Sequence, residues 1–226
     1  MTKDAGTELI QRGLAMRGYD IGPAGADGIF GPRTAAAGQA WLSAGGKYRP
    51  VAPAPVSEAP VGGAVPWVTE LLSVFGLHET RDNVALRKWL LSDGATLGNP
   101  AQLPWCGDAM ETAIKRALPK EPFEGDMKAN PYWARNWLGF GVTCQPAYGA
   151  VAVFSREGGG GHVGVVVAQD ANRWHVLGGN QGNAINVVGI DKRRLLGFRW
   201  PVTFPNRNQA VPHRPAGDIA TSRNEV

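Results

Sequence analysis

The sequence has few of the residues that form covalent cross-links or metal centres. It contains only two cysteines and four histidines in 226 residues. Cys106 and Cys144 could form one bridge, but two thiols do not make the disulfide framework of a small secreted domain, and they lack zinc-site spacing. We therefore predict that both thiols are reduced and that the protein uses no metal and no other cofactor.

Long apolar runs and clusters of like charge are also missing. The apolar stretch 163–168 is far shorter than the roughly 20 residues that span a bilayer. The net charge of +4, without a run of five or six like charges, indicates only mild attraction to polyanions. Residues 1–8 contain acidic residues and no apolar segment, which is not typical of a secretory signal. We expect no nucleic-acid partner, no stable membrane association, and export by some other factor if the substrate lies outside the cytoplasm.

Changes of composition divide the chain into four parts. Residues 1–47 have helical periodicity interrupted by a glycine-rich loop, and residues 48–65 are rich in proline, as in a semi-rigid linker. Residues 66–204 are long enough and apolar enough to bury a core of their own. Residues 205–226 are polar with almost no aromatic residue, which predicts disorder, or order only by docking.

The order of elements in the third part indicates its fold class. Helical patterns come first, and one of them runs from Cys106 to about Leu118 and stops before Pro119. Three further helices are expected. One begins at Pro66, one runs from Asn83 to Leu91 with Val84 inward, and one covers 130–140. Short apolar runs follow at 150–154, 162–168, 173–177, 185–188 and 195–200. Helices followed by strands predict an α+β domain with an antiparallel sheet.

Three residues have the chemistry and the chain order of a thiol hydrolase. Cys106 lies where a loop enters an amphipathic helix, and the N–H groups of a first helical turn favour a reactive thiolate. His162 follows four glycines at the start of a strand, and Asn180 lies at the end of the next strand. Together they could supply a nucleophile, a base and a group that orients the base. The Cys106 backbone N–H is the expected oxyanion donor.

Less specific interpretations remain open for the same residue types. A lone cysteine is more often a small buried hydrophobic residue than a nucleophile, and we expect this of Cys144. His175 lies in an alternating strand and is expected to be an ordinary strand residue, while no spacing requires Glu79 at the site. Asp108, two residues after the nucleophile, is close enough to raise the thiol pKa by charge repulsion.

The first part resembles a known wall-binding family. Its periodicity alone fits a generic helical hairpin equally well. However, Leu9-Ile10-Gln11, Gly18-Tyr19 and Asp27-Gly28-Ile29-Phe30-Gly31 resemble, in order, the three-helix peptidoglycan-binding module of cell-wall hydrolases. The resemblance implies that Asp27, Phe30 and Thr34 lie at or near a contact with the glycan-peptide; Thr34 is also expected to cap the following helix.

Residues 66–201 contain six separated motifs of a second family. The motifs are Pro66-Trp67 with Gly76 and Glu79, Pro104-Trp105-Cys106, Ala134-Arg135 with Trp137-Leu138, Gly161-His162-Val163-Gly164, Leu177-Gly178-Gly179-Asn180-Gln181, and Leu196-Gly197-Phe198-Arg199-Trp200-Pro201. They resemble the papain-like cell-wall hydrolases of the CHAP and NlpC/P60 superfamily. The resemblance implies Cys106 as nucleophile, His162 as base and acid, and Asn180 as the orienting residue.

The resemblance also suggests substrate contacts and shows two departures. Trp105 and Gln181, which adjoin Cys106 and Asn180, are expected to bind substrate. Ala150 stands where the family usually has an aspartate, so a supporting carboxylate is missing. Gly107-Asp108 follows the nucleophile, where the family prefers a small serine or alanine.

The two resemblances together predict a peptidoglycan hydrolase that cleaves an amide of the stem peptide. The expected role is that of a bacteriophage endolysin, a monomer that stays in the host cytoplasm until it reaches the wall. One alternative is an injected antibacterial effector with the same chemistry. Another is a wall-binding or virion protein without activity. The sequence does not distinguish an N-acetylmuramoyl-L-alanine amidase from an endopeptidase.

Overall fold

The computed structural model describes residues 29–43, 65–205 and 209–214, together with Thr7, Ile10, Gln11, Leu14, Tyr19 and Ile21. The chain divides into two units, Met1–Ala59 and Pro60–Val226, and each is described by itself. Apart from Val65, the expected linker at 48–65 lies outside the described residues.

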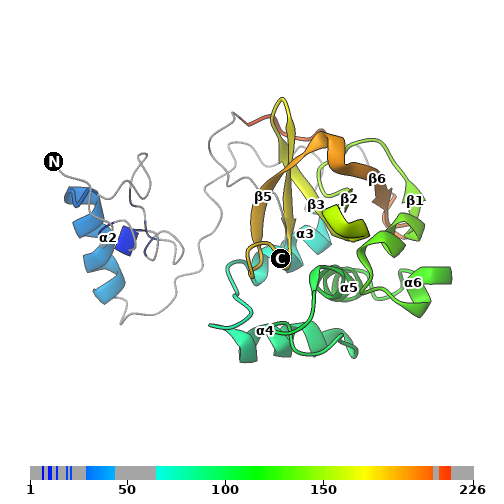
Figure 1. Cartoon of the computed structure of the whole chain (residues 1–226), viewed down its shortest axis with the longest axis horizontal. Helices are drawn as coiled ribbons and strands as arrows, with labels where there is room; N and C mark the ends of the chain where they lie inside the picture. The colour runs from blue at the N-terminus through cyan, green and yellow to red at the C-terminus, as the bar shows by residue number, and fades with distance from the viewer. Residues whose placement is uncertain are drawn as a thin grey trace. The chain divides into compact units, whose positions relative to one another are not determined.

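The smaller unit contains helix α2, Pro32–Ser43 (Figure 1). Pro32 begins the helix because its fixed φ suits a first helical residue and its missing N–H is not needed there. Thr34 is therefore the third residue of the helix, so the expectation that it caps the helix is wrong. Leu14, Tyr19 and Ala37 form a small buried cluster. The expected three-helix module remains a prediction, because most of residues 1–28 lie outside the described part of the chain.

The helices of the larger unit follow the sequence pattern with local exceptions. The structure has α3 Pro66–Ser73, α4 Asn83–Leu90, α5 Cys106–Ala117, α6 Gly125–Ala129, and the short 3-10 helices Leu91–Asp93, Ala134–Gly139, Glu157–Gly159 and Lys192–Arg194. The expected helix at 130–140 is reduced to the 3-10 helix Ala134–Gly139. Val84 is 84% exposed and does not point inward as expected.

A six-stranded antiparallel sheet is described in this unit. Its strands are β1 Val142–Thr143, β2 Val151–Ser155, β3 Gly161–Gln169, β4 Arg173–Gly178, β5 Asn186–Asp191 and β6 Leu195–Trp200. Their order across the sheet is β1-β6-β2-β3-β4-β5. The combination of helices and an antiparallel sheet agrees with the predicted α+β class.

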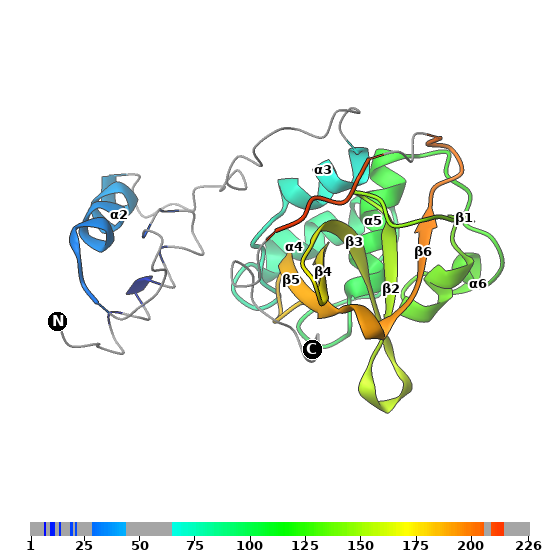
Figure 2. The same ribbon diagram turned by 90° about the horizontal axis from the view of Figure 1, so that it is seen from above.

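Helix α5 packs against β3, β4 and α3 (Figures 1 and 2). Its residues from Cys106 to Ile114 are all buried, with Met110, Ala113 and Ile114 fully so. This burial, more than helix propensity, stabilises a helix of this length. In the part of the chain that the structure describes, no helix is both long enough and apolar enough to cross a membrane.

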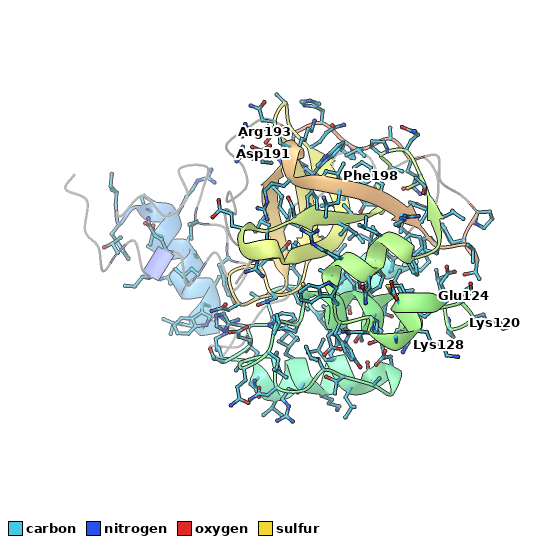
Figure 3. All side chains as sticks on the ribbon, turned by 45° about the vertical axis from the view of Figure 1, so that its right-hand side comes forward. Lys120, Glu124, Lys128, Asp191, Arg193 and Phe198 are labelled. Carbon is cyan, nitrogen blue, oxygen red and sulfur yellow. The ribbon has the colours of Figure 1, made fainter. Side chains whose placement is uncertain are left out.

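The sheet is strongly coiled. Trp174 on β4 and Phe198 on β6 meet edge to face with ring centroids 5.1 Å apart, although a flat sheet would hold these strands about 14 Å apart. The coil brings side chains of distant strands together over one face. Figure 3 shows Phe198 on β6, and Asp191 beside Arg193 at the preceding turn, where the two side chains are hydrogen-bonded at 2.6 Å.

Residues 209–214 of the expected tail are ordered by docking. The Gln169 N–H donates to Pro212 O at 2.9 Å, and the Arg214 N–H donates to Gln169 O at 2.8 Å. The segment thus extends backbone pairing at the end of β3. Disorder is therefore the wrong expectation for these six residues, because composition does not reveal that a polar segment can bond to the end of a strand. Residues 215–226 lie outside the described part.

Gly141→Ala is expected to destabilise the larger unit by more than about 2 kcal/mol. Gly141 has φ +48°, and an added Cβ would clash with the backbone carbonyl of Trp200. Gly125→Ala is the matched control, because Gly125 has φ +51° and open space around its Cβ position. Urea unfolding gives the free energy of unfolding of both variants. The difference between their losses is the cost of the clash, because both variants share the cost of a positive φ. Equal losses of stability in the two variants would contradict this account.

Candidate functional site

Cys106 is the first residue of α5, as predicted, and its side chain is buried, with 4% of the residue exposed. Burial raises the pKa of the Cys106 thiol. Hydrogen bonds from the backbone of Val163 and Gly107 and the positive charge of Arg156 oppose this rise without cancelling it. The lowered pKa expected from the helix start is therefore wrong, because desolvation outweighs the helix N-terminus. The resting thiol is protonated and needs a base.

His162 lies at the second position of β3, opposite Phe154 of β2, and is completely buried. The next residue, Val163, is the one whose backbone hydrogen-bonds the Cys106 side chain. The start of β3 and the start of α5 therefore lie together, which brings the predicted base next to the predicted nucleophile.

Gln181 holds the imidazole in place. Its Oε1 lies 2.9 Å from His162 Nε2. Its Nε2 donates to the carbonyl oxygens of Val176, Gly178 and Asn186, at 2.6 to 3.3 Å. These acceptors fix the orientation of the amide, so Oε1 faces the ring, and an amide oxygen only accepts. His162 Nε2 therefore carries a proton, and Nδ1 is the nitrogen that can act as base.

The side chain that orients His162 is thus Gln181. The sequence had indicated Asn180, and that prediction is wrong. Asn180 has φ +58° in the turn after β4, and this left-handed backbone turns its side chain away from the direction that a strand residue would have. The expectation that Gln181 binds substrate is also wrong. Gln181 is completely buried and its amide is already used by His162 and backbone oxygens.

Trp105 likewise supports the site from inside the protein. It is only 1% exposed, and its indole Nε1 donates to Glu79 Oε2 at 2.9 Å. Gly179 lies so close that an added Cβ would be 2.5 Å from the Trp105 ring. The predicted contact of Trp105 with substrate is therefore wrong, because its ring fills the space between the start of α5 and the turn after β4.

A pocket of about 420 Å³ lies against the loop that precedes Cys106. It is lined by residues 100–104 of the loop before Cys106 and by the polar residues Glu79, Arg156, Asn180 and Asn183. Arg156 was not expected at the site from the sequence, and no spacing required Glu79 there. Arg156 lies in the turn between β2 and β3, and only strand pairing brings that turn to α5. The pocket is lined by one carboxylate, one guanidinium and the three side-chain amides of Gln102, Asn180 and Asn183.

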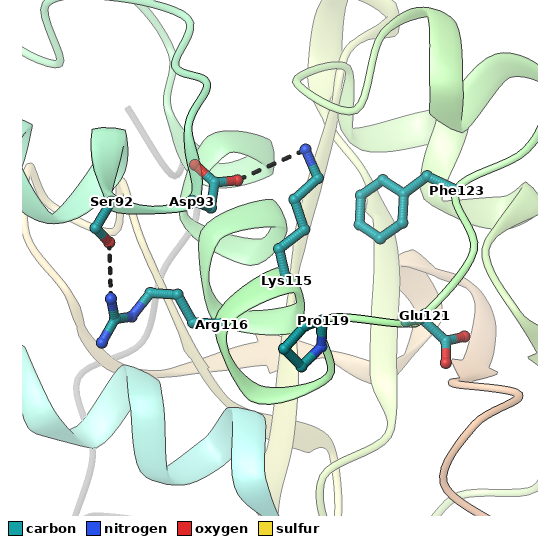
Figure 4. Close-up of a pocket in the computed structure, with 7 residues that line it drawn as sticks. All are labelled: Ser92, Asp93, Lys115, Arg116, Pro119, Glu121 and Phe123. Carbon is teal, nitrogen blue, oxygen red and sulfur yellow. Dashed lines mark hydrogen bonds and ion pairs between the residues drawn. The ribbon is translucent and has the colours of Figure 1, made fainter.

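A larger pocket, of about 620 Å³, lies near the other end of α5, about 14 Å along the helix axis from Cys106. Figure 4 shows Lys115 facing Asp93 and Arg116 facing Ser92. Lys115 Nζ lies 3.7 Å from Asp93 Oδ2, and Arg116 donates to Ser92 Oγ at 3.2 Å. Because these charges are already satisfied, the pocket is less suited to a charged ligand than the one beside Cys106.

His175 on β4 is the second buried histidine, and it does not take part in this site. Its Nε2 lies 3.0 Å from Asp170 Oδ2. Asp170 follows β3, so it lies at the opposite end of that strand from His162. Although burial acts to raise it, hydrogen bonds from His175, Asn172 and Arg173 hold the pKa of Asp170 well below its usual range. The pair stabilises the β3–β4 turn.

Asp108 points away from the thiol. Its Oδ2 accepts from Thr96 Oγ1 at 2.9 Å and from the Leu97 N–H at 3.0 Å, so it closes the loop before α5. Burial, and not Asp108, is the main cause that raises the Cys106 pKa. Cys106 and Asp108 are two positions apart on the helix, and side chains at this spacing leave the helix axis on different sides.

Asp108→Asn is expected to change how stability depends on pH. Burial raises the Asp108 pKa to about 6. Between pH 4 and 6 the unfolded carboxyl has lost its proton while the folded one retains it, so this group lowers stability as pH rises, by up to about 3 kcal/mol. Asparagine keeps the acceptor without the charge. Urea unfolding at pH 4.5 and 7.5 should show a gain for the variant that is clearly larger at pH 7.5. A gain of equal size at both pH values would contradict the titration.

The three predicted ligand contacts of the smaller unit differ in whether the structure leaves them exposed. Phe30 is 60% exposed and remains available to a ligand. Thr34 is 3% exposed and accepts a hydrogen bond from Gln11 Nε2 at 3.0 Å, so its hydroxyl serves the internal packing and the predicted contact is wrong. Asp27 lies outside the described residues.

Comparison of the chain with known protein families, with well-characterised proteins and with solved structures finds no match. Among the residues that the structure describes, no three His, Cys, Asp or Glu side chains are grouped so that they could hold a metal ion. A functional assignment therefore depends on the chemistry of Cys106, His162 and Gln181.

Proposed function

We propose that residues 66–204 form a papain-like cysteine hydrolase that cleaves an amide bond in the stem peptide of peptidoglycan. One observation carries the proposal: His162, held by Gln181, directly precedes the residue whose backbone contacts the Cys106 thiol. This arrangement supplies the nucleophile, base and orienting group that thiol-dependent amide hydrolysis requires.

The raised pKa of Cys106 determines how the reaction would begin. Because the resting thiol is protonated, His162 Nδ1 takes its proton as the sulfur attacks the scissile carbonyl. The backbone N–H at the start of α5 stabilises the resulting oxyanion. His162 then returns the proton to the leaving amine, which leaves a thioester on Cys106. Water hydrolyses the thioester, releasing a carboxylate and the free thiol.

The pocket beside Cys106 supports a peptide substrate. Stem peptides carry carboxylates and amines close to their amide bonds, and Arg156 and Glu79 offer one charge of each sign at the pocket wall. Paired charges of this kind contribute specificity more than affinity. The substrate amide would enter between this pocket and the buried sulfur.

The smaller unit is proposed to bind the wall, with the exposed Phe30 ring among its contacts. A tethered binding module would raise the local concentration of the hydrolase at an insoluble substrate. This combination favours the role of an endolysin that acts on peptidoglycan as a monomer after release from the host cytoplasm.

The burial of Cys106 supports a second candidate, a wall-binding protein without activity. A thiol that is 4% exposed and has a raised pKa is typical of a buried structural cysteine as well as of a shielded nucleophile. Under this alternative the intact chain would sediment with peptidoglycan sacculi and leave them undigested.

The test is digestion of purified sacculi, with mass spectrometry of the soluble products. The proposal predicts fragments with a new amine and a new carboxylate and no new reducing sugar ends. New reducing ends without new amines would mean that a glycosidic bond is cut, which would overturn it. Sedimentation without any soluble product would establish the binding protein instead.

A further inference from the structure

Trp133 lies beside the proposed catalytic centre with 49% of its surface exposed. Single exposed hydrophobic residues are common on protein surfaces and need no explanation by themselves. The position of Trp133 is different because its neighbours in the chain contact the neighbours of both Cys106 and His162.

Glycines allow these two contacts. The carbonyl group of Tyr132 lies against Gly107, which follows Cys106, and a Cβ there would clash with it. On the other side, a Cβ added to Gly161, which precedes His162, would lie 3.1 Å from Arg135 Cγ. Trp133 lies between Tyr132 and Arg135 in the chain. The backbone of residues 132–135 therefore runs from Gly107, which follows Cys106, to Gly161, which precedes His162.

The segment that carries Trp133 is held rigidly. The Trp137 indole donates to Pro131 O at 2.7 Å, and Asn136 Nδ2 donates to Asn130 O at 2.9 Å. The Asn136 N–H donates to Trp133 O at 2.9 Å, and Arg135 Nε donates to Gly160 O at 2.9 Å. The backbone that carries the Trp133 ring is therefore in place before a ligand arrives, so little backbone entropy is lost on binding.

The two flanks of the centre therefore differ in chemistry. One is the pocket with Glu79 and Arg156, and the other is the segment 132–135, which carries the half-exposed Trp133. A flat aromatic face suits a pyranose ring, whose C–H groups pack on the indole while its hydroxyls stay in water. A charged peptide suits the pocket.

We propose that Trp133 is the stacking platform for a sugar ring next to the scissile amide, and that the bond cut joins the lactyl group of the glycan to the first amino acid. This inference rests on the proposed function. In this case the C–N bond of the lactyl amide breaks, the lactyl carbonyl forms the thioester with Cys106, and the stem peptide leaves as an amine protonated by His162. Water then releases a lactyl carboxylate and restores the thiol.

The test measures binding and turnover separately. Binding is measured by calorimetry in the Cys106→Ala background, with a disaccharide-tetrapeptide and with the same tetrapeptide without sugar. We expect the sugar-containing ligand to bind on the order of tenfold more tightly, and Trp133→Ala to remove this preference. Trp133→Phe should retain part of it. Val202→Ala is the matched control. Val202 is 43% exposed and follows the last residue of β6, and its replacement should leave the preference for the sugar-containing ligand unchanged.

Turnover by the chain with Cys106 intact is followed by mass spectrometry of the products. A disaccharide with a free lactyl carboxylate and an intact free tetrapeptide are expected. If the sugar preference survives Trp133→Ala, or if cleavage that requires Cys106 occurs only inside the peptide, the inference is overturned while the proposed function stands. If the wild type cuts no amide in either ligand, both are overturned.

Discussion

Cys106→Ala is expected to lower the rate of sacculus digestion by at least about 10³-fold, because it removes the sulfur atom proposed to form the thioester. The substitution is small and the site is buried, so the fold should persist. The rate is measured as release of soluble amine-bearing fragments under identical conditions. Sedimentation of the variant with sacculi shows that wall binding survives the loss of activity.

Cys144→Ala is the matched control for this prediction. Cys144 is the second cysteine, is partly buried, and packs against the core away from α5, with its N–H directed to Phe198 O at 3.4 Å. Its replacement should leave digestion within about twofold of wild type, since surface and edge substitutions usually have small effects. Full activity of Cys106→Ala, or equal loss in both variants, would remove Cys106 from the mechanism.

Gln181→Met should lower kcat by about 10²-fold or more, with a much smaller change in KM, because it deletes the hydrogen bond that fixes the tautomer of His162. Methionine has a similar length, but its thioether sulfur is only a weak acceptor for the Nε2 proton. The pH dependence of kcat should also shift, since the imidazolium loses its acceptor. A purely structural role would change stability and would leave the pH profile in place.

Asn180→Gly provides the comparison. Glycine tolerates φ +58°, so this substitution removes the side chain without straining the turn. Because Asn180 lines the pocket, we expect mainly a rise in KM, with kcat within about tenfold of wild type. If Asn180→Gly lost more kcat than Gln181→Met, the orienting role would return to Asn180. Circular dichroism melts of both variants exclude unfolding as the cause.

Local sequence signals predicted the elements that hold the site. The helix from Cys106 to Ala117 has an apolar face at helical spacing and ends before a proline, and five of the six strands are apolar runs bounded by glycine or polar turns. The sixth, Val142–Thr143, has only two residues and no periodicity from which it could be recognised. Cys106 and His162 could be selected because each begins such an element.

The exposure and direction of side chains were not available from the sequence. Trp105 and Thr34 both carry groups that bind ligands in other proteins, yet each is buried here and hydrogen-bonded to a residue distant in the chain. The partner of Trp105 is Glu79, and the partner of Thr34 is Gln11. Arg156 and Trp133 reach the site through strand pairing and through close contacts at glycines. These contacts depend on three-dimensional packing and leave no periodic signal.

The sequence by itself determined the α+β class, the position of Cys106 at a helix start and that of His162 near a strand start. These features follow from hydrophobic period and from glycine and proline placement, which act within a few residues. Only the tertiary structure decided that Gln181 orients His162, that the Cys106 pKa is raised, and that Asp108 faces the preceding loop. Each of these depends on burial and on the backbone direction at a turn, and both arise when distant segments pack together.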